Sequence, residues 1–324
     1  MDIIKMQKEY IFGDDRPFKS CHASTIINLL NDEFLAAWFA GTEEGAPDVD
    51  IWCARKSDGK WSTPYRICGE KGLPHWNPVL FKGNNNILYL YYKVGHTIPN
   101  WYTRVIESED NGVTWSKPKE LVIGDIGGRG PVRNKPIILQ NGNWLAPASL
   151  EKDQWAVFVD ISRDQGKTWE RSKLIDVDLS EIKGEGFIQP SLWESDPNKV
   201  HMLIRSSEGA IFRSDSEDGG ETWNIAYRTA LPNNNSGIDL TQMDNSSLVL
   251  VYNPVPINWG PRTPLILSYS ADNGDNWKGK ISLEMNDGEY SYPAIVSEGR
   301  KTYITYTWNR ERIVFWEIEW EEKI

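Results

Sequence analysis

Short runs of apolar residues, many alternating with polar ones, recur along the whole chain. Clear examples are 87–92, 155–159, 248–252 and 301–306. These runs are rich in β-branched and aromatic residues and are bounded by Gly, Asn or Pro, which is typical of β-strands. No window of about 12 residues carries a convincing apolar period of 3.6, the period of an amphipathic helix. The pattern therefore predicts an all-β protein.

A second pattern interrupts the strands at a fixed interval. Tryptophans recur every 54 residues, at Trp61, Trp115, Trp169, Trp223 and Trp277. The last four close a box that reads Ser-x-Asp-x-Gly-x-Thr-Trp, with Asn for Thr in the fourth copy, and a shortened copy spans 57–61. The Asp carboxylate can accept backbone N–H groups across a turn, and the Gly supplies a positive φ. Each box thus predicts a hairpin turn, and its Trp is expected to pack between neighbouring repeats.

The interval also predicts the architecture. About four strands fit in each repeat, which is one blade of a β-propeller, and six repeats of 54 account for all 324 residues. A fixed repeat favours one array over the two domains that the length alone suggests. We therefore predict an all-β, six-bladed β-propeller that spans residues 1–324 as a single domain.

The sixth blade has no box, because the next tryptophan of the series would fall beyond residue 324. We expect the N-terminal residues Glu9–Phe12 to supply the outermost strand of this blade, and Tyr290–Glu319 to supply the others. Closure of this kind leaves no open strand pair where the two chain ends meet.

Composition and charge narrow the class of function. With 40% hydrophobic residues, 25% charged residues and 16 Trp, the chain can bury a core and is not disordered. The net charge of −11 is spread along the chain without a basic stripe, which argues against a nucleic-acid partner. Three cysteines without CxxC spacing argue against a disulfide framework or a zinc site. No stretch reaches the roughly 20 apolar residues of a membrane span, and residues 1–10 lack an apolar signal core, so we expect a cytoplasmic protein with no membrane partner.

The starts of the innermost strands define a candidate site. In a propeller these strands surround the axis, whose mouth is the deep concave site. Aligned on a proline or a small residue, the six strands begin at 21–24, 76–79, 134–137, 188–191, 237–240 and 291–294. The residues in phase are His22, Asn77, Lys135, Gln189, Ile238 or Asp239, and Tyr292. Polar and titratable groups that converge on one cavity indicate a ligand site.

The box resembles the signature repeat of the sialidase superfamily of six-bladed propellers, and the resemblance covers the whole chain. It implies roles for four residues. Arg205 and Arg262 match two of the three arginines with which sialidases bind the carboxylate of sialic acid, and Tyr292 matches their nucleophilic tyrosine. Asp48 lies near the place of their acid/base aspartate. Because a guanidinium pairs a carboxylate bidentately, an anionic sugar is the expected partner.

Two positions depart from the sialidase pattern. Where sialidases have Arg-Ile-Pro in the first blade, this chain has Cys21-His22-Ala23, and where they have the glutamate that activates the tyrosine, it has Gln189. Glutamine cannot accept a proton, and a tyrosine with an ordinary pKa of about 10 and no paired base is a weak nucleophile at neutral pH. The combination looks more like a non-sialidase branch, which includes propeller-type rhamnose–glucuronate lyases and ulvan lyases.

We therefore predict a carbohydrate-active enzyme that cleaves a glycosidic bond at an acidic, uronate-type sugar. In β-elimination an arginine neutralises the carboxylate and so acidifies the C5 proton; either His22 or Tyr292 abstracts this proton, and the other protonates the leaving oxygen. The predicted substrate-binding residues are Arg205, Arg262, Lys135, Gln189, His75, Asn77, Asp48, Arg133 and Arg310. No cofactor or metal is expected. The alternatives are a sialidase-like exo-glycoside hydrolase, a non-catalytic carbohydrate-binding propeller and a protein-interaction propeller, the last disfavoured by the polar cluster at the axis.

Overall fold

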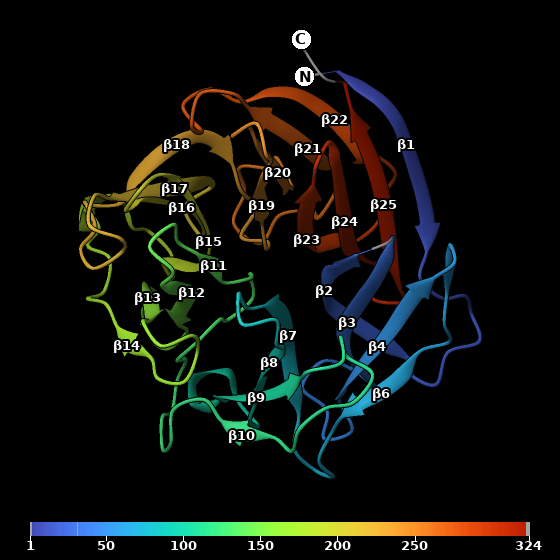
Figure 1. Cartoon of the computed structure of the whole chain (residues 1–324). Helices are drawn as coiled ribbons and strands as arrows, with labels where there is room; N and C mark the ends of the chain where they lie inside the picture. Colours follow the sequence, from blue (N-terminus) through green and yellow to red (C-terminus); the bar gives the residue numbers. More distant parts are fainter. Residues whose placement is uncertain (1, 31, 322–324) are drawn as a thin grey trace.

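Six antiparallel sheets are arranged as a ring around one axis, which Figure 1 views end-on. The computed structural model describes residues 2–30 and 32–321. The prediction of an all-β, six-bladed propeller is confirmed, and the helical elements of the described residues are two short 3-10 turns, η1 (Ile98–Asn100) and η2 (Leu179–Glu181).

The strands of the first three blades follow one another along the chain. Blade one holds β2 (Ser20–Leu30), β3 (Glu33–Gly41), β4 (Asp50–Ser57), β5 (Lys60–Trp61) and β6 (Tyr65–Cys68). Blade two holds β7 (His75–Lys82), β8 (Leu88–Val94), β9 (Tyr102–Ser108) and β10 (Lys119–Glu120). Blade three holds β11 (Ile137–Ile138), β12 (Trp144–Leu150), β13 (Ala156–Ser162) and β14 (Glu170–Arg171).

The last three blades repeat the arrangement. Blade four holds β15 (Phe187–Asp196), β16 (Lys199–Ser206), β17 (Ala210–Ser216) and β18 (Tyr227–Pro232). Blade five holds β19 (Asp239–Gln242), β20 (Leu248–Tyr252), β21 (Leu265–Ser270) and β22 (Lys278–Glu284). Blade six holds β23 (Tyr290–Glu298), β24 (Lys301–Trp308) and β25 (Arg312–Trp320), and β1 (Ile3–Tyr10) is its outermost strand.

Strand β1 runs antiparallel to β25, with Tyr10 opposite Val314 and Ile3 opposite Trp320. The blue N-terminal strand therefore lies beside the red C-terminal strand in Figure 1. The strand begins six residues before the expected Glu9–Phe12, because its alternating side chains continue the pairing as far as Ile3.

The turns of the boxes are built by their own side chains. In the box at Ser216, the Asp218 carboxylate accepts hydrogen bonds from the backbone N–H of Thr222, at 2.9 Å, and from the hydroxyl of Ser216, at 2.8 Å. The Ser216 hydroxyl in turn accepts the N–H of Gly220, whose φ is +89°. These bonds satisfy the backbone of a tight turn, so the recurring sequence produces a recurring hairpin.

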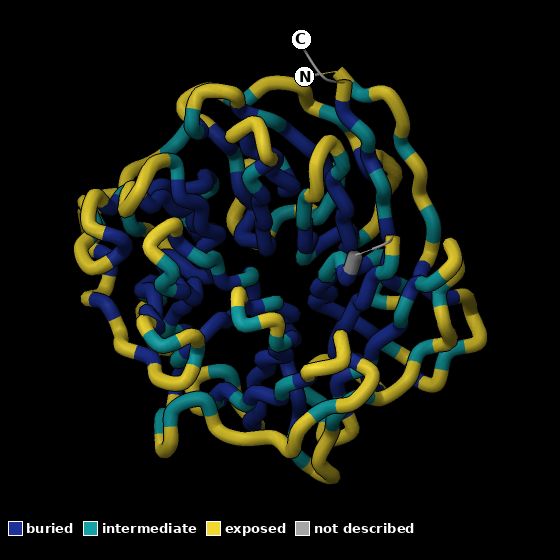
Figure 2. The backbone as a smooth tube through the Cα atoms, viewed as in Figure 1, coloured by how far each residue is buried: buried dark blue, intermediate teal, exposed yellow. Residues whose placement is uncertain are grey.

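The apolar core lies between adjacent blades. The box tryptophans contribute to it: Trp223 packs into the cluster shared by blades three and four, and Trp277 into the one shared by blades four and five. Figure 2 shows the result, with buried residues in the inner and middle strands and exposed residues along the rim and the turns. None of the helical segments in the described part of the chain is long and apolar enough to cross a membrane.

Candidate functional site

Four of the innermost strands begin with the same backbone irregularity. Ala23, Asn77, Gln189 and Tyr292 all have a positive φ, between 41° and 56°, and the pairing with the second strand shifts its register at each of them. A left-handed conformation is strained for residues with a side chain, by roughly 1 kcal/mol or more. Strain repeated at equivalent positions around one axis marks these strand starts as a candidate functional site.

The alignment of the first strand is corrected by one residue. His22 lies opposite Phe39, as Ile188 lies opposite Arg205, so Ala23 and not His22 is the structural equivalent of Gln189 and Tyr292. The proline used for alignment in other blades corresponds to Ser24, and without a proline the sequence did not fix the phase. His22 nevertheless lies against Tyr292, with ring centroids 4.2 Å apart.

Tyr292 is the centre of a cluster of arginines that come from four different parts of the chain. The guanidinium carbons of Arg133, Arg205 and Arg262 lie 5.2, 5.6 and 5.6 Å from the centroid of its ring. Arg205 Nη1 also donates a hydrogen bond to the Tyr292 hydroxyl at 2.9 Å. A phenol oxygen that accepts from a guanidinium is stabilised as an oxyanion by the fixed positive charge.

Arg205, at the end of β16, is buried among neutral groups. Besides Tyr292, it donates from Nε to Asn235 Oδ1 and from Nη1 to Gln189 Oε1, both at 2.9 Å. Its side chain is also close to two tryptophans, since the guanidinium carbon lies 5.9 Å from the rings of Trp155 and Trp259. The residue is only 2% exposed, and within the described part of the chain it forms no ion pair.

Arg133 is the second buried guanidinium without a carboxylate partner among the residues described. It is 1% exposed, and its Nη2 donates to the backbone oxygens of Tyr292 and Pro293, at 2.5 and 2.9 Å. Burial lowers its pKa to about 10, which leaves the side chain charged at neutral pH. Two buried cations that form no direct ion pair in the described residues lie beside one tyrosine, and an anion bound there would be stabilised by both.

Arg262 and Arg310 complete the cluster and share one carboxylate. Glu289 Oε1 accepts from Arg262 Nη1 at 2.8 Å and from Arg310 Nε at 2.7 Å. Burial favours a raised pKa for Glu289, but the charges of Arg310 and Arg262 outweigh it and lower the pKa. Arg310 also donates to Glu44, in the loop after β3, at 2.5 Å. Glu289 and Glu44 thus pair with Arg262 and Arg310, whereas Arg133 and Arg205 form no ion pair among the described residues.

The environment of His22 keeps its imidazole neutral. The pKa of His22 is well below its usual range, first because the side chain is fully buried and then because Arg310, Arg262, Arg133 and Arg205 repel a further positive charge. Its Nδ1 lies 2.9 Å from the Thr307 hydroxyl. When Nδ1 carries the proton of that contact, Nε2 is left as an acceptor.

Glu151, which the sequence did not single out, lies behind this cluster. Its Oε1 accepts a hydrogen bond from Gln189 Nε2 at 3.2 Å, and burial raises its pKa despite the nearby charge of Arg205. A carboxyl group is therefore present beside the position where sialidases carry their glutamate, but Gln189 separates it from Tyr292. The missed residues Glu151, Glu289, Asn235 and Trp259 lie in irregular loops between strands, where no periodicity assigns them to the axis. Trp155 begins the apolar run 155–159, which predicted a strand and not a site residue.

Four of the predicted binding residues do not contact the cluster. Lys135 pairs with Asp239, whose Oδ2 is 2.9 Å from its Nζ, and lines a pocket of about 470 Å³ at the opposite ends of the innermost strands. Asn77 donates to the backbone oxygen of Val132 at 3.1 Å.

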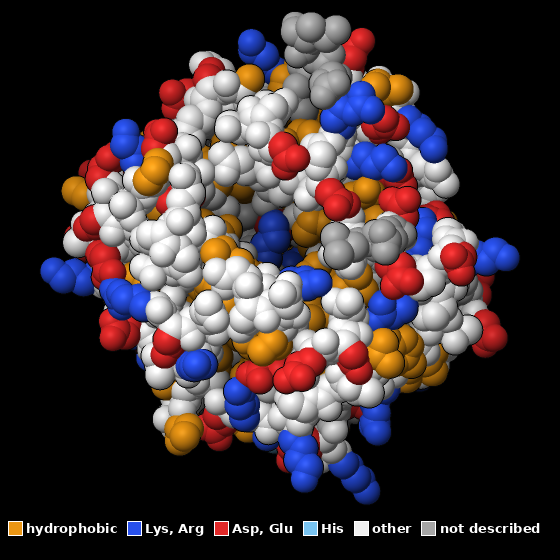
Figure 3. Space-filling model, viewed as in Figure 1, with side chains coloured by type: hydrophobic (Ala, Val, Ile, Leu, Met, Phe, Trp, Pro, Cys, Tyr) orange, Lys and Arg blue, Asp and Glu red, His pale blue; other side chains and the backbone are white. Residues whose placement is uncertain are grey.

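One face of the propeller, seen down the axis in Figure 3, is hollowed at its centre, with basic side chains inside the hollow.

The other two predicted binding residues outside the cluster, His75 and Asp48, line pockets away from it. His75 stacks on Tyr92, with ring centroids 5.5 Å apart, and lines a pocket of about 450 Å³ at the boundary between blades one and two. Asp48 is exposed and accepts both the N–H and the hydroxyl of Thr42, and the bond from the hydroxyl contributes most to lowering its pKa. It lines a separate pocket with Arg16 and Lys19. Neither the proximity of His75 to Trp76 in the sequence nor the resemblance that pointed to Asp48 thus placed a side chain in the arginine cluster.

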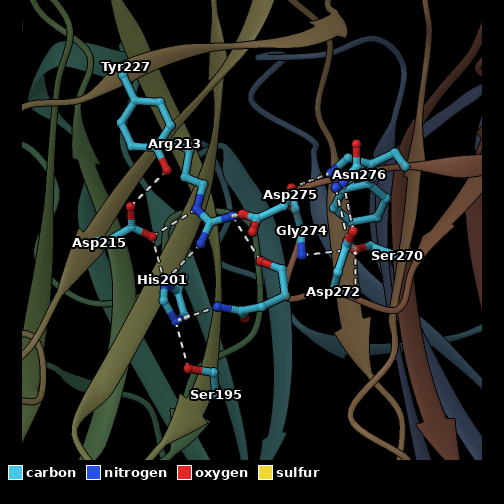
Figure 4. A network of polar contacts seen from close by, with 12 residues as sticks. Ser195, His201, Arg213, Asp215, Tyr227, Ser270, Asp272, Gly274, Asp275 and Asn276 are labelled. Atoms are coloured by element: carbon cyan, nitrogen blue, oxygen red, sulfur yellow. Dashed lines mark hydrogen bonds and ion pairs between the residues drawn. The ribbon is translucent and has the colours of Figure 1, made fainter.

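A polar network in blade four has the Ser-His-Asp connectivity of a hydrolase triad, but it lies where blade four meets blade five (Figure 4). Ser195 Oγ lies 2.8 Å from His201 Nε2, and His201 Nδ1 lies 2.5 Å from Asp215 Oδ1. Arg213 donates to the same Asp215 oxygen at 2.8 Å and to the backbone oxygen of Asn273 in blade five at 2.8 Å. Because Arg213 joins the two blades through this network, we assign the network to the blade interface.

In the described part of the chain, no group of three or more His, Cys, Asp or Glu side chains is arranged to hold a metal ion. The three cysteines form no disulfide; Cys21 and Cys53 are buried and Cys68 is partly buried.

A boxed propeller whose axis carries arginines around one tyrosine is a sialidase-like propeller. The chain belongs to the BNR repeat-like domain family, whose model matches residues 32–304. A sialidase of Clostridium perfringens is 26% identical over 133 residues, covering 34% of this chain and 32% of the sialidase. The match thus spans about a third of that relative's length.

Solved structures share the fold over almost the whole chain. The Hadza microbial sialidase Hz136 superimposes with a TM-score of 0.79 at 15% identity, over 97% of this chain and 68% of that one. The Trypanosoma rangeli sialidase gives 0.76 at 16%, over 96% and 59%. A Dyadobacter fermentans protein of unknown function gives 0.77 at 17%, over 99% of both chains. At such identities the likeness shows the fold alone.

Proposed function

We propose that the protein binds a carboxylate-bearing sugar at the arginine cluster and cleaves a glycosidic bond of that sugar by β-elimination. The observation that carries the proposal is the charge state of the site. Arg205 and Arg133 are buried without a carboxylate partner in the described residues, and Arg205 donates to the hydroxyl of Tyr292. A planar guanidinium fork can pair bidentately with the carboxylate of such a sugar.

The chemistry follows from the groups around Tyr292. With the carboxylate paired to Arg205 and Arg262, negative charge that develops on C5 is stabilised through the carboxylate. His22 accepts the C5 proton at Nε2, the bond from C4 to the leaving oxygen breaks, and a double bond forms between C4 and C5. Tyr292 protonates the leaving oxygen, and Arg205 stabilises the phenolate that remains.

The bound carboxylate also acts on the base. The positive charges of the four arginines contribute to the low pKa of His22. A negative charge placed among them removes part of that repulsion and makes the imidazole a better base. The substrate's carboxylate is thus needed both for binding and for proton transfer, which favours acidic sugars over neutral ones.

A direct test uses a panel of uronate-terminated oligosaccharides and sialosides. β-Elimination generates an unsaturated uronate that absorbs in the near ultraviolet, and hydrolysis releases a reducing end without that absorbance. Unsaturated product from uronates is the expected result. Sugar release without it would replace the lyase mechanism by a hydrolase mechanism, and binding without turnover of any substrate would leave a carbohydrate-binding propeller.

A further inference from the structure

A second pocket lies between blades three and four, beside the arginine cluster. Its volume is about 440 Å³, within the range of pockets that hold small ligands. Twelve residues line it, and only Gln154 and Asp176 among them are polar. The lining of this pocket is therefore mostly apolar, whereas the site at the axis is charged.

The pocket has a buried floor and an exposed rim. Phe187 and Ile204 belong to the core between the two blades and are 4% and 0% exposed. Leu174 and Leu179, in the segment that leads from blade three to blade four, are 43% and 70% exposed. Large apolar side chains gathered at the edge of an apolar cavity are a feature of binding surfaces.

One aromatic ring is shared by this pocket and the arginine cluster. Trp155 lines the pocket, and its ring lies 5.9 Å from the guanidinium carbon of Arg205. The neighbour of Arg205 in β16, Ile204, also lines the pocket. The backbone N–H of Trp155 donates to the backbone oxygen of Glu185 at 2.8 Å and Trp155 forms a parallel bridge with Gly186, so the backbone at this residue is held in place. Trp155 and the adjacent residues Ile204 and Arg205 thus place the apolar pocket next to the arginine cluster.

We propose that the pocket is a second subsite, which binds an aromatic or branched alkyl group attached to the anion held by the arginine cluster. The inference rests on the proposed function for the position of the anion, and it adds the class of substrate: a sugar acid that carries an apolar substituent. Burial of that substituent against Trp155, Leu179 and Phe187 contributes affinity in proportion to the apolar area removed from water.

The experiment compares methyl β-glucuronide with phenyl β-glucuronide by calorimetric titration. Neither has a sugar at O4, so β-elimination of a glycan does not consume them. The wild-type protein is expected to bind the phenyl glycoside about tenfold more tightly or better. In the rim variant Leu174→Ser/Leu179→Ser the two glycosides should bind within about twofold of each other, with the methyl glycoside unaffected. The matched control is Ile123→Ser/Ile225→Ser, since these isoleucines are 92% and 60% exposed and do not line the pocket.

Equal affinity of both glycosides for the wild-type protein, or a phenyl preference that survives in the rim variant, would overturn the subsite. If neither glycoside binds, the proposed function fails for glucuronides, and a probe without a sugar decides the subsite. The fluorescence of 8-anilinonaphthalene-1-sulfonate, an aromatic anion, should then rise with the wild-type and control proteins but not with the rim variant. Equal fluorescence with all three proteins would overturn the subsite independently of the sugar.

Discussion

Arg205 Nη1 lies 2.9 Å from the hydroxyl oxygen of Tyr292, although they are 87 residues apart in the sequence and blade five lies between their blades. The contact joins the guanidinium to a side chain that also lies against Arg133, Arg262 and His22. Since the remaining partners of Arg205, Gln189 and Asn235, are neutral, its charge is available to a ligand.

Replacement of Arg205 by methionine should weaken anion binding by roughly thirtyfold or more without unfolding the protein. Loss of a buried, charge-assisted partner costs at least about 2 kcal/mol, or roughly thirtyfold in Kd. The melting temperature should change little, because the substitution also removes a buried cation that has no ion pair among the described residues. Titration with a uronate and a thermal melt measure the two effects. Arg228→Met, an exposed arginine of the same blade, is the control, and equal binding by both variants would remove Arg205 from the site.

Tyr292→Phe should lower turnover by roughly a hundredfold or more while the carboxylate still binds. The substitution removes the hydroxyl that protonates the leaving oxygen but keeps the ring that packs against His22. Steady-state kinetics should show the loss in kcat rather than in KM. Tyr290→Phe changes a nearby hydroxyl that contacts only the Asp287 backbone and should retain activity. A Tyr292→Phe enzyme with normal kcat would contradict the assignment.

His22 should make the protein less stable in mild acid. Its folded pKa lies well below the ordinary value of about 6.5, so below that pH the unfolded chain binds a proton that the folded protein excludes. The stability that depends on neutral His22 is complete above about pH 6.5 and falls as the pH decreases.

Between about pH 7 and about pH 5, wild-type protein should lose up to about 2 kcal/mol more than His22→Phe. Urea unfolding at the two pH values measures the difference. His75, whose pKa burial also lowers, adds an acid dependence that both proteins share. His96→Asn, a change in an exposed loop, should behave as the wild type does, and parallel losses in wild-type and His22→Phe protein would refute the prediction.

Asp218→Ala should destabilise the fold and leave the site intact. The Asp218 carboxylate accepts two bonds from Thr222 and one from Ser216 within its box turn. Because water replaces part of these bonds at the exposed turn, the loss should be about 1 kcal/mol. Urea unfolding detects it, and uronate titration should give an unchanged Kd. The control is Glu217→Ala, a change at the neighbouring exposed residue. Loss of uronate binding by Asp218→Ala would contradict the prediction, since it would show that the box turn affects the site.

The sequence determined the blades, because the signals for them are local and repeated. The box at Ser216 contains all the side chains that build its turn, and the run Leu248–Tyr252 coincides with β20. The resemblance to sialidases also pointed to Arg205, Arg262 and Tyr292, and the structure brings these three together. Arg133 and Arg310, chosen from loops, join them.

Only the tertiary structure decided which polar side chains meet at the axis and with what charge. The starts of the innermost strands are irregular, so one missing proline left the phase of His22 undetermined, and Lys135, in phase by sequence, pairs with Asp239 instead. Glu151, Glu289 and Trp259 lie in loops with no period. Their positions depend on how six blades close into a ring, and a local pattern contains no information about contacts across that ring.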